Sequence, residues 1–155
     1  KHMIFSGTVF IVSWLLFVFF ADKKKFFKFS PTCYIAIILG LGTDILIHSY
    51  PLWTYPCETL TQKLARHYLD DLGIYFVVTY LFLQTLPKRK TIMTIGLHVF
   101  LWTIPSISLE VIAILTQSME HGLWWSLYYS YAADWILFIF FYFHYRLRIK
   151  YAGLS

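Results

Sequence analysis

Five long stretches of mostly apolar residues fill most of this chain, and short charged or proline-containing segments separate them. The stretches cover residues 3–21, 31–49, 68–86, 91–117 and 122–143. A helix rises about 1.5 Å per residue, so each stretch is long enough to cross ~30 Å of bilayer hydrocarbon. Apolar residues make up 59% of the chain and charged residues 14%, whereas soluble domains are about a quarter charged. The sequence therefore predicts an all-α integral membrane bundle of five transmembrane helices, forming a single transmembrane domain over residues 1–155.

The basic residues lie almost entirely at one end of this predicted bundle. Ten lie in or beside the segments that follow the first, third and fifth stretches: Lys23, Lys24, Lys25, Lys28, Lys88, Arg89, Lys90, Arg146, Arg148 and Lys150. The other end has Lys63 and Arg66, because Lys1 and His2 precede Met3 and are interpreted as the remnant of an expression tag. By the positive-inside rule, the N-terminus is outside and the C-terminus is cytoplasmic. Despite the net charge of +5, clusters beside a membrane favour anionic lipid headgroups, not nucleic acid, as partners.

The acidic residues have the opposite distribution. Seven of the eight, all except Asp22, fall in the outer loops, the outer half or the middle of the predicted membrane region. Asp44, Glu110 and Asp134 interrupt apolar stretches, where a charge at the middle of a helix costs ~2.5 kcal/mol or more. Such residues should face the bundle interior or water. We therefore expect the second to fifth helices to enclose an acidic pocket that opens outward, with the first helix packed outside it.

The pocket hypothesis assigns one group of candidate binding residues. They are Asp44, His48, His67, Asp70, Asp71, Glu110, Asp134, Trp124 and Trp125. The two tryptophans have an ordinary role as interfacial anchors and a functional one as an aromatic wall that binds a cation. A protonatable acid inside a membrane is also what a proton relay requires. The predicted function is to bind, sense or pass a small cation, a proton or a cationic solute.

Other functions are compatible with the same residues. The acids can instead tie helices together by hydrogen bonds, as in a non-catalytic scaffold or accessory subunit. No motif in the sequence identifies a cofactor. A divalent metal such as zinc is one candidate, and the corresponding function is a membrane-embedded metal-dependent enzyme that acts on lipid or headgroup substrates. The candidate metal ligands are His48, His67, His121, Asp44 and Asp70. Two haems, held by His48 with His67 and by His98 with His144, are a further hypothesis. An inverted-repeat transporter with five helices per chain would need a homo-oligomer.

Several short motifs follow one another in an order that resembles a known family. They are Leu52-Trp53-Thr54-Tyr55, His67, Ser108-Leu109-Glu110, His121-Gly122-Leu123-Trp124-Trp125-Ser126 and His144-Tyr145-Arg146. From about Lys23 to the C-terminus, the chain is similar to an uncharacterised family of small polytopic membrane proteins of Bacillus-like, spore-forming Gram-positive bacteria. The resemblance implies a multi-pass protein of a bacterial plasma membrane with about five spans. It implies no activity.

Overall fold

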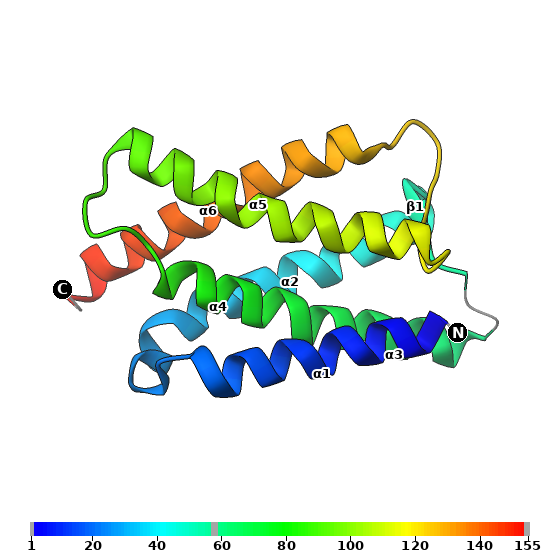
Figure 1. Cartoon of the computed structure of the whole chain (residues 1–155), viewed down its shortest axis with the longest axis horizontal. Helices are drawn as coiled ribbons and strands as arrows, with labels where there is room; N and C mark the ends of the chain where they lie inside the picture. Colours follow the sequence, from blue (N-terminus) through cyan, green and yellow to red (C-terminus); the bar gives the residue numbers. More distant parts are fainter. Residues whose placement is uncertain (1, 57–58, 154–155) are drawn as a thin grey trace.

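The computed structural model describes residues 2–56 and 59–153, and within them the chain forms five long helices that lie side by side (Figure 1). They are α1 (His2–Phe20), α2 (Phe26–Ser49), a third helix made of three consecutive segments, α5 (Ile92–Leu115) and α6 (Leu127–Ala152). The third helix consists of α3 (Leu60–Asp70), the π-helical turn η2 (Asp71–Tyr75) and α4 (Phe76–Gln84). Successive helices run in opposite directions, and the two chain ends lie at opposite ends of the bundle. The predicted all-α fold is confirmed.

Helix boundaries differ from the prediction in three places. The second helix begins at Phe26 instead of 31, after the short 3₁₀ turn η1 (Lys23–Lys25). The third begins at Leu60 instead of 68, because Thr59 and Gln62 form a capping box that starts it two turns earlier. The fifth covers Leu127–Ala152 instead of 122–143, because the residues before it form a strand and a turn. Apolar length thus located the helices better than it located their ends.

Pro31 lies inside α2 and does not open it, which leaves a backbone acceptor to be satisfied. A proline has no N–H to donate to the carbonyl four residues earlier, which here belongs to Phe27. The Arg148 guanidinium, from the end of α6, donates from Nη2 to the carbonyls of Phe27 at 3.2 Å and Lys28 at 2.6 Å. The freed carbonyl is therefore bound by a side chain of another helix.

The third helix widens at η2, where it packs closely on α1. A Cβ on Gly73 would lie 2.7 Å from a ring carbon of Phe10, so only glycine allows the two helices to approach this closely. The extra residue in a π turn rotates the side chains that follow it relative to those before it. Asp71 and Tyr75 both belong to this turn and both point toward α2, since both lie beside Gly40.

The two ends of the bundle have different charges. The α1–α2 turn, the first turn of α2, the α4–α5 loop and the end of α6 lie together at one end (Figure 1), and they carry the ten basic residues. Lys63 and Arg66, on α3, lie at the other. The segregation predicted from the sequence is therefore present in the fold.

Much of the outer surface is apolar. Ile92, Phe27 and Phe19 have exposed fractions of 95%, 85% and 76%. By length and composition, two helices in the described residues are able to cross a membrane, Lys23–Ser49 and Ile92–Leu115, and Ile4–Phe20 is a shorter apolar helix. Within the most apolar segments of the two, 33% and 17% of the residues are buried, so these helices are not core helices covered by protein. The count of five spans stays a prediction.

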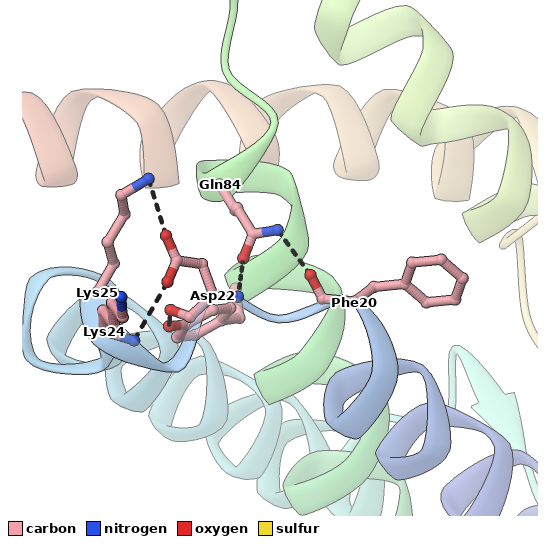
Figure 2. A network of polar contacts seen from close by, with 6 residues as sticks. Phe20, Asp22, Lys24, Lys25 and Gln84 are labelled. Carbon is pink, nitrogen blue, oxygen red and sulfur yellow. Dashed lines mark hydrogen bonds and ion pairs between the residues drawn. The ribbon is translucent and has the colours of Figure 1, made fainter.

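A polar network fixes the α1–α2 turn to α4 at the basic end (Figure 2). The Gln84 side chain accepts from the Asp22 backbone N–H at 2.7 Å and donates to the Phe20 carbonyl at 2.8 Å. Asp22 caps η1 through Lys24 N–H and pairs with Lys25 at 3.0 Å. The Lys25 ammonium, which binds the carboxylate, holds the pKa of Asp22 below its usual value. One glutamine therefore supplies both a donor and an acceptor to the turn.

The hydrophobic core fills the basic half of the bundle. It contains Phe17, Phe29, Cys33, Ala36, Phe76, Val77, Tyr80, Phe82, Leu83, Val99, Phe138, Phe141, Tyr142 and Tyr145. The opposite half is closed by a two-stranded antiparallel sheet, in which β1 (Trp53–Thr54) pairs with β2 (Glu120–His121). This sheet joins the loop after α2 to the loop before α6. Glu110 and Asp134 line a cavity whose wall includes the core residues Ala36 and Phe141 and the sheet residue Trp53.

Candidate functional site

A cavity of about 320 Å³ lies beneath the sheet, between α2, η2, α5 and α6. Its lining consists of Ala36, Leu39, Gly40, Thr43, Trp53, Tyr55, Tyr75, Ser106, Glu110, Met119, Trp125, Ser130, Ala133, Asp134, Leu137 and Phe141. Both carboxylates in this lining, Glu110 and Asp134, were candidate binding residues. Among the described side chains, none from α1 belongs to it. The cavity therefore lies among the second to fifth helices, where the sequence predicts a pocket.

Glu110 is the centre of a hydrogen-bond network on one wall. Its Oε1 accepts from the Ser130 hydroxyl at 2.6 Å and lies 2.7 Å from His121 Nε2. The Ser130 Oγ in turn accepts from the indole N–H of Trp125 at 2.8 Å. When Glu110 is ionised it only accepts, so the nearby imidazole nitrogen carries the proton. Residues of α5, β2 and α6 thus hold this carboxylate in one position.

Asp134, one turn beyond Ser130 on α6, has fewer partners. The Ser106 hydroxyl of α5 hydrogen-bonds its carboxylate, and Glu110 is near enough for the two negative charges to repel each other. Its side chain has no ion pair among the residues that the structure describes. The cavity therefore holds two carboxylates with one adjacent histidine, an arrangement that attracts a positive charge.

Aromatic side chains cover the cavity at the sheet. The rings of Trp53 and Trp125 have centroids 5.2 Å apart, and Tyr55 follows directly after β1. Burial raises the pKa of the Tyr55 phenol, and the negative charge of Asp70 acts in the same direction, so this ring is neutral. Gly122, after β2, donates to the Leu52 carbonyl at 2.7 Å, and a Cβ on it would overlap the Pro51 carbonyl oxygen. Only glycine therefore lets the two loops approach this closely.

A second polar cluster, formed by residues of α2, α3 and η2, lies next to Gly40 and Tyr75. Asp44 on α2 pairs with His67 on α3, with 2.7 Å between Oδ2 and Nδ1, and Asp71 lies close to Asp44. Two carboxylates at short range repel each other unless one takes up a proton or a cation is shared.

The buried Arg66 supplies the positive charge of this cluster. Its Nε lies 3.6 Å from Asp70 Oδ2, and its guanidinium lies 4.1 Å from the centre of the Tyr55 ring. The side chain of Asp71 is 2% exposed and its Oδ2 has no hydrogen-bond partner in the described chain. The cluster contains Asp44, His67, Asp70 and Asp71, four of the candidate binding residues.

The remaining candidates lie elsewhere. His48 is exposed, with Nδ1 3.4 Å from the Lys63 ammonium. Trp125 lines the cavity, whereas Trp124 is 53% exposed and donates to the Tyr50 hydroxyl at 3.0 Å. Both tryptophans precede α6 and are not part of it. The two rings stay neighbours, with centroids 5.7 Å apart, but Trp125 lines the cavity and Trp124 does not.

The candidate metal and haem ligands are distributed over several places. His67 pairs with Asp44, His121 pairs with Glu110, and His48 contacts the Lys63 ammonium. Within residues 2–56 and 59–153, no three His, Cys, Asp or Glu side chains form a metal-binding group. His98 contacts the Phe82 carbonyl, and His144 contacts the Thr32 hydroxyl. The zinc and haem hypotheses stay predictions.

Trp53, Tyr55, Tyr75 and Arg66 are among the lining and cluster residues that were not candidates. Trp53 and Tyr55 belong to an aromatic and proline-containing run, 50–56, whose composition alone does not show that it folds over the bundle. Tyr75 reaches the cavity through a π turn that no pattern in the sequence indicates. Arg66 reads as an ordinary loop cation, but it is 2% exposed. Its position four residues before Asp70 on the same helix, the spacing of an ion pair, was the available signal.

No protein-family model, curated protein or solved structure that was compared with this chain matches it. The resemblance to the family of small polytopic membrane proteins therefore stays a prediction.

Proposed function

We propose that this protein is a multi-pass membrane protein whose five long helices span a bacterial plasma membrane, with the basic end in the cytoplasm. The apolar outer surface supports this, because monomeric soluble proteins rarely expose apolar patches larger than a few hundred Å². The segregation of ten basic residues to one end also supports it. The bacterial location comes from the family resemblance. In this proposal the third helix, α3, η2 and α4 together, crosses the membrane as one continuous span from Leu60 to Gln84.

Within that bundle, the cavity binds, senses or passes a small cation, a proton or a cationic solute. The observation that carries this proposal is that Glu110 and Asp134, from two helices, line one cavity in the half of the bundle opposite the cytoplasmic end. Carboxylates used only to join helices need no shared cavity, and serine or threonine would join helices without the cost of a charge. The neighbouring Asp44–Asp71 pair adds a second place where a proton can be held.

The test compares three isosteric variants in the full-length protein reconstituted in liposomes. Glu110→Gln and Asp134→Asn remove a charge from the cavity, whereas Glu120→Gln removes one from an exposed position on β2 outside it. We expect the first two to abolish binding and flux of protons, Na⁺ and methylammonium, because the lost charge is itself the functional group. The third should behave as the unmodified protein.

A pH-sensitive dye inside the liposomes reports protons, and isotope uptake reports the other two cations. Circular dichroism of each variant in one detergent, before reconstitution, shows whether it is folded. We expect the free energy of unfolding to change by no more than the ~0.6 kcal/mol of an intramembrane hydrogen bond. Equal cation binding and flux in the unmodified protein, Glu110→Gln and Asp134→Asn would refute the proposal. The same holds if the unmodified protein neither binds nor moves any of the three cations.

A further inference from the structure

We infer that the ligand of this cavity is an organic cation, a quaternary or alkylated ammonium group carried on an apolar body, and not a bare metal ion. This inference rests on the proposed cation-binding function and names its substrate class. It follows from the combination of lining residues and size. The cavity has two carboxylates in a wall that is otherwise mostly aromatic and aliphatic.

The aromatic residues supply what an alkylated ammonium needs. Trp53, Tyr55, Tyr75 and Trp125 line the same cavity as the two carboxylates. The face of an aromatic ring attracts a cation through its quadrupole, most strongly for tryptophan, and the attraction increases where water is excluded. An alkylated ammonium loses little hydration when it leaves water, because its charge is already covered by carbon. A bare Na⁺ or Ca²⁺ instead requires a shell of oxygen ligands at short range.

The volume also indicates a molecule. About 320 Å³ corresponds to the lower end of the range for small-molecule pockets, roughly 300–1,000 Å³. A proton or a metal ion fills almost none of this space. Leu39, Leu137 and Phe141 line it as well, and they offer contacts to the apolar body of a ligand.

The charges fit a single positive centre. Glu110 is shared with His121 and with the Ser130 hydroxyl, whereas Asp134 has the Ser106 hydroxyl as its partner. His121 pairs with Glu110, so Asp134 is the lining carboxylate that has no basic partner among the described residues, and one monovalent cation would supply that partner. We therefore place the ammonium group beside Asp134 and the body of the ligand against the tryptophans.

The test measures binding of labelled benzyltrimethylammonium by equilibrium dialysis, with the full-length protein in lipid nanodiscs. Choline and its uncharged isostere 3,3-dimethyl-1-butanol are the competitors. Trp125→Leu removes an aromatic face of the cavity, Trp125→Phe keeps a ring, and Trp124→Leu changes the neighbouring tryptophan, which lies outside the lining. Na⁺ binding is measured in parallel for every variant.

We expect choline to compete and the alcohol not to compete. Trp125→Leu should weaken benzyltrimethylammonium binding about 3- to 30-fold, the range that corresponds to one cation–π contact, while Trp125→Phe keeps most of it and Trp124→Leu changes nothing. Circular dichroism spectra should be equal for all three variants and the unmodified protein, which shows that the variants are folded.

Two results overturn the inference but leave the proposed function standing. One is Na⁺ or proton binding that requires Glu110 and Asp134 without any binding of benzyltrimethylammonium. The other is equal loss of benzyltrimethylammonium binding in Trp124→Leu and Trp125→Leu. Competition by the alcohol as strong as that by choline also overturns it, because the site would then recognise an apolar shape and not a charge. If no cation binds in a way that depends on the two carboxylates, both proposals fail together.

Discussion

Replacing Gly40 by alanine tests the contact between α2 and η2 that forms one wall of the cavity. A Cβ at this position would overlap the Asp71 carboxylate and would lie 3.3 Å from a ring carbon of Tyr75. Asp71 has a short side chain that is 2% exposed, so it has little room to move away. Gly42, on the same helix, has no atom within 4 Å of its Cβ position, which makes Gly42→Ala a matched control.

The expected magnitude comes from two opposing terms. Each glycine-to-alanine change in a helix gains about 0.5–1 kcal/mol from reduced backbone freedom. At Gly40 the added methyl group also overpacks a filled site, which costs about 1–3 kcal/mol. The helix term is the same in both variants and cancels in their comparison. Gly40→Ala should therefore have a free energy of unfolding about 1–3 kcal/mol lower than Gly42→Ala.

The assay is denaturant unfolding of the purified protein in one detergent, followed by circular dichroism. Combining Gly40→Ala with Asp71→Ala removes the overlapping carboxylate, so the double variant should recover part of the loss as a coupling energy. If Gly40→Ala and Gly42→Ala have equal free energies of unfolding, or if the double variant shows no coupling, then Asp71 does not pack against α2 and the described wall is wrong.

Three further predictions concern the ends of the bundle. In a cysteine-free background and intact cells, a cysteine at Glu120 should react with an impermeant thiol reagent and one at Lys88 should not, and the reverse pattern would invert the orientation. Gln84→Met should lower the free energy of unfolding by about 1 kcal/mol, because the Asp22 N–H and the Phe20 carbonyl lose their partner and water replaces it only in part. An unchanged denaturation midpoint would show that Gln84 does not form these two hydrogen bonds. The lowered pKa of Asp22 means that its ion pair with Lys25 stabilises the fold above the ordinary carboxyl pKa of 3.8 and loses that effect as the pH falls through the folded-state pKa. Asp22→Asn should therefore flatten the acid limb of the stability profile, and identical limbs would contradict the pairing.

The positions of the helices were predictable because apolar length and charge act over many residues at once. Their ends were not, since local groups decide them, as the Thr59 capping box does for the third helix. The second predicted stretch, 31–49, begins at Pro31, and a proline is common in the first turn of a helix. In the structure Pro31 lies inside α2, where Arg148 from the other end of the chain binds the carbonyl that the proline leaves free. Pro31 and Arg148 are too far apart in the sequence for any local pattern to predict their contact.

Some residues of the candidate site were likewise predictable from the sequence, and others were not. Glu110 and Asp134 were identifiable because a charge in an apolar stretch is costly and therefore conspicuous. The aromatic cover was not identifiable, because β1 and β2 are two residues each and pair across a long separation in sequence. Tyr75 was hidden for another reason, since a π turn changes the side-chain period that sequence patterns assume. Which of these residues share a cavity is a property of the fold.

The ties between α2 and α6 determine how the cavity can change size. Arg148 links the beginning of α2 to the end of α6, and the β1–β2 pairing links the segment after α2 to the segment before α6. α2 and α6 are therefore connected to each other at both of their ends. To move α2 away from α6, either the Arg148 hydrogen bonds or the β1–β2 pairing would have to break. A displacement of α5 would require neither of these two connections to break. We expect spin labels on α2 and α6 to keep one separation, and labels on α2 and α5 to report any widening on binding.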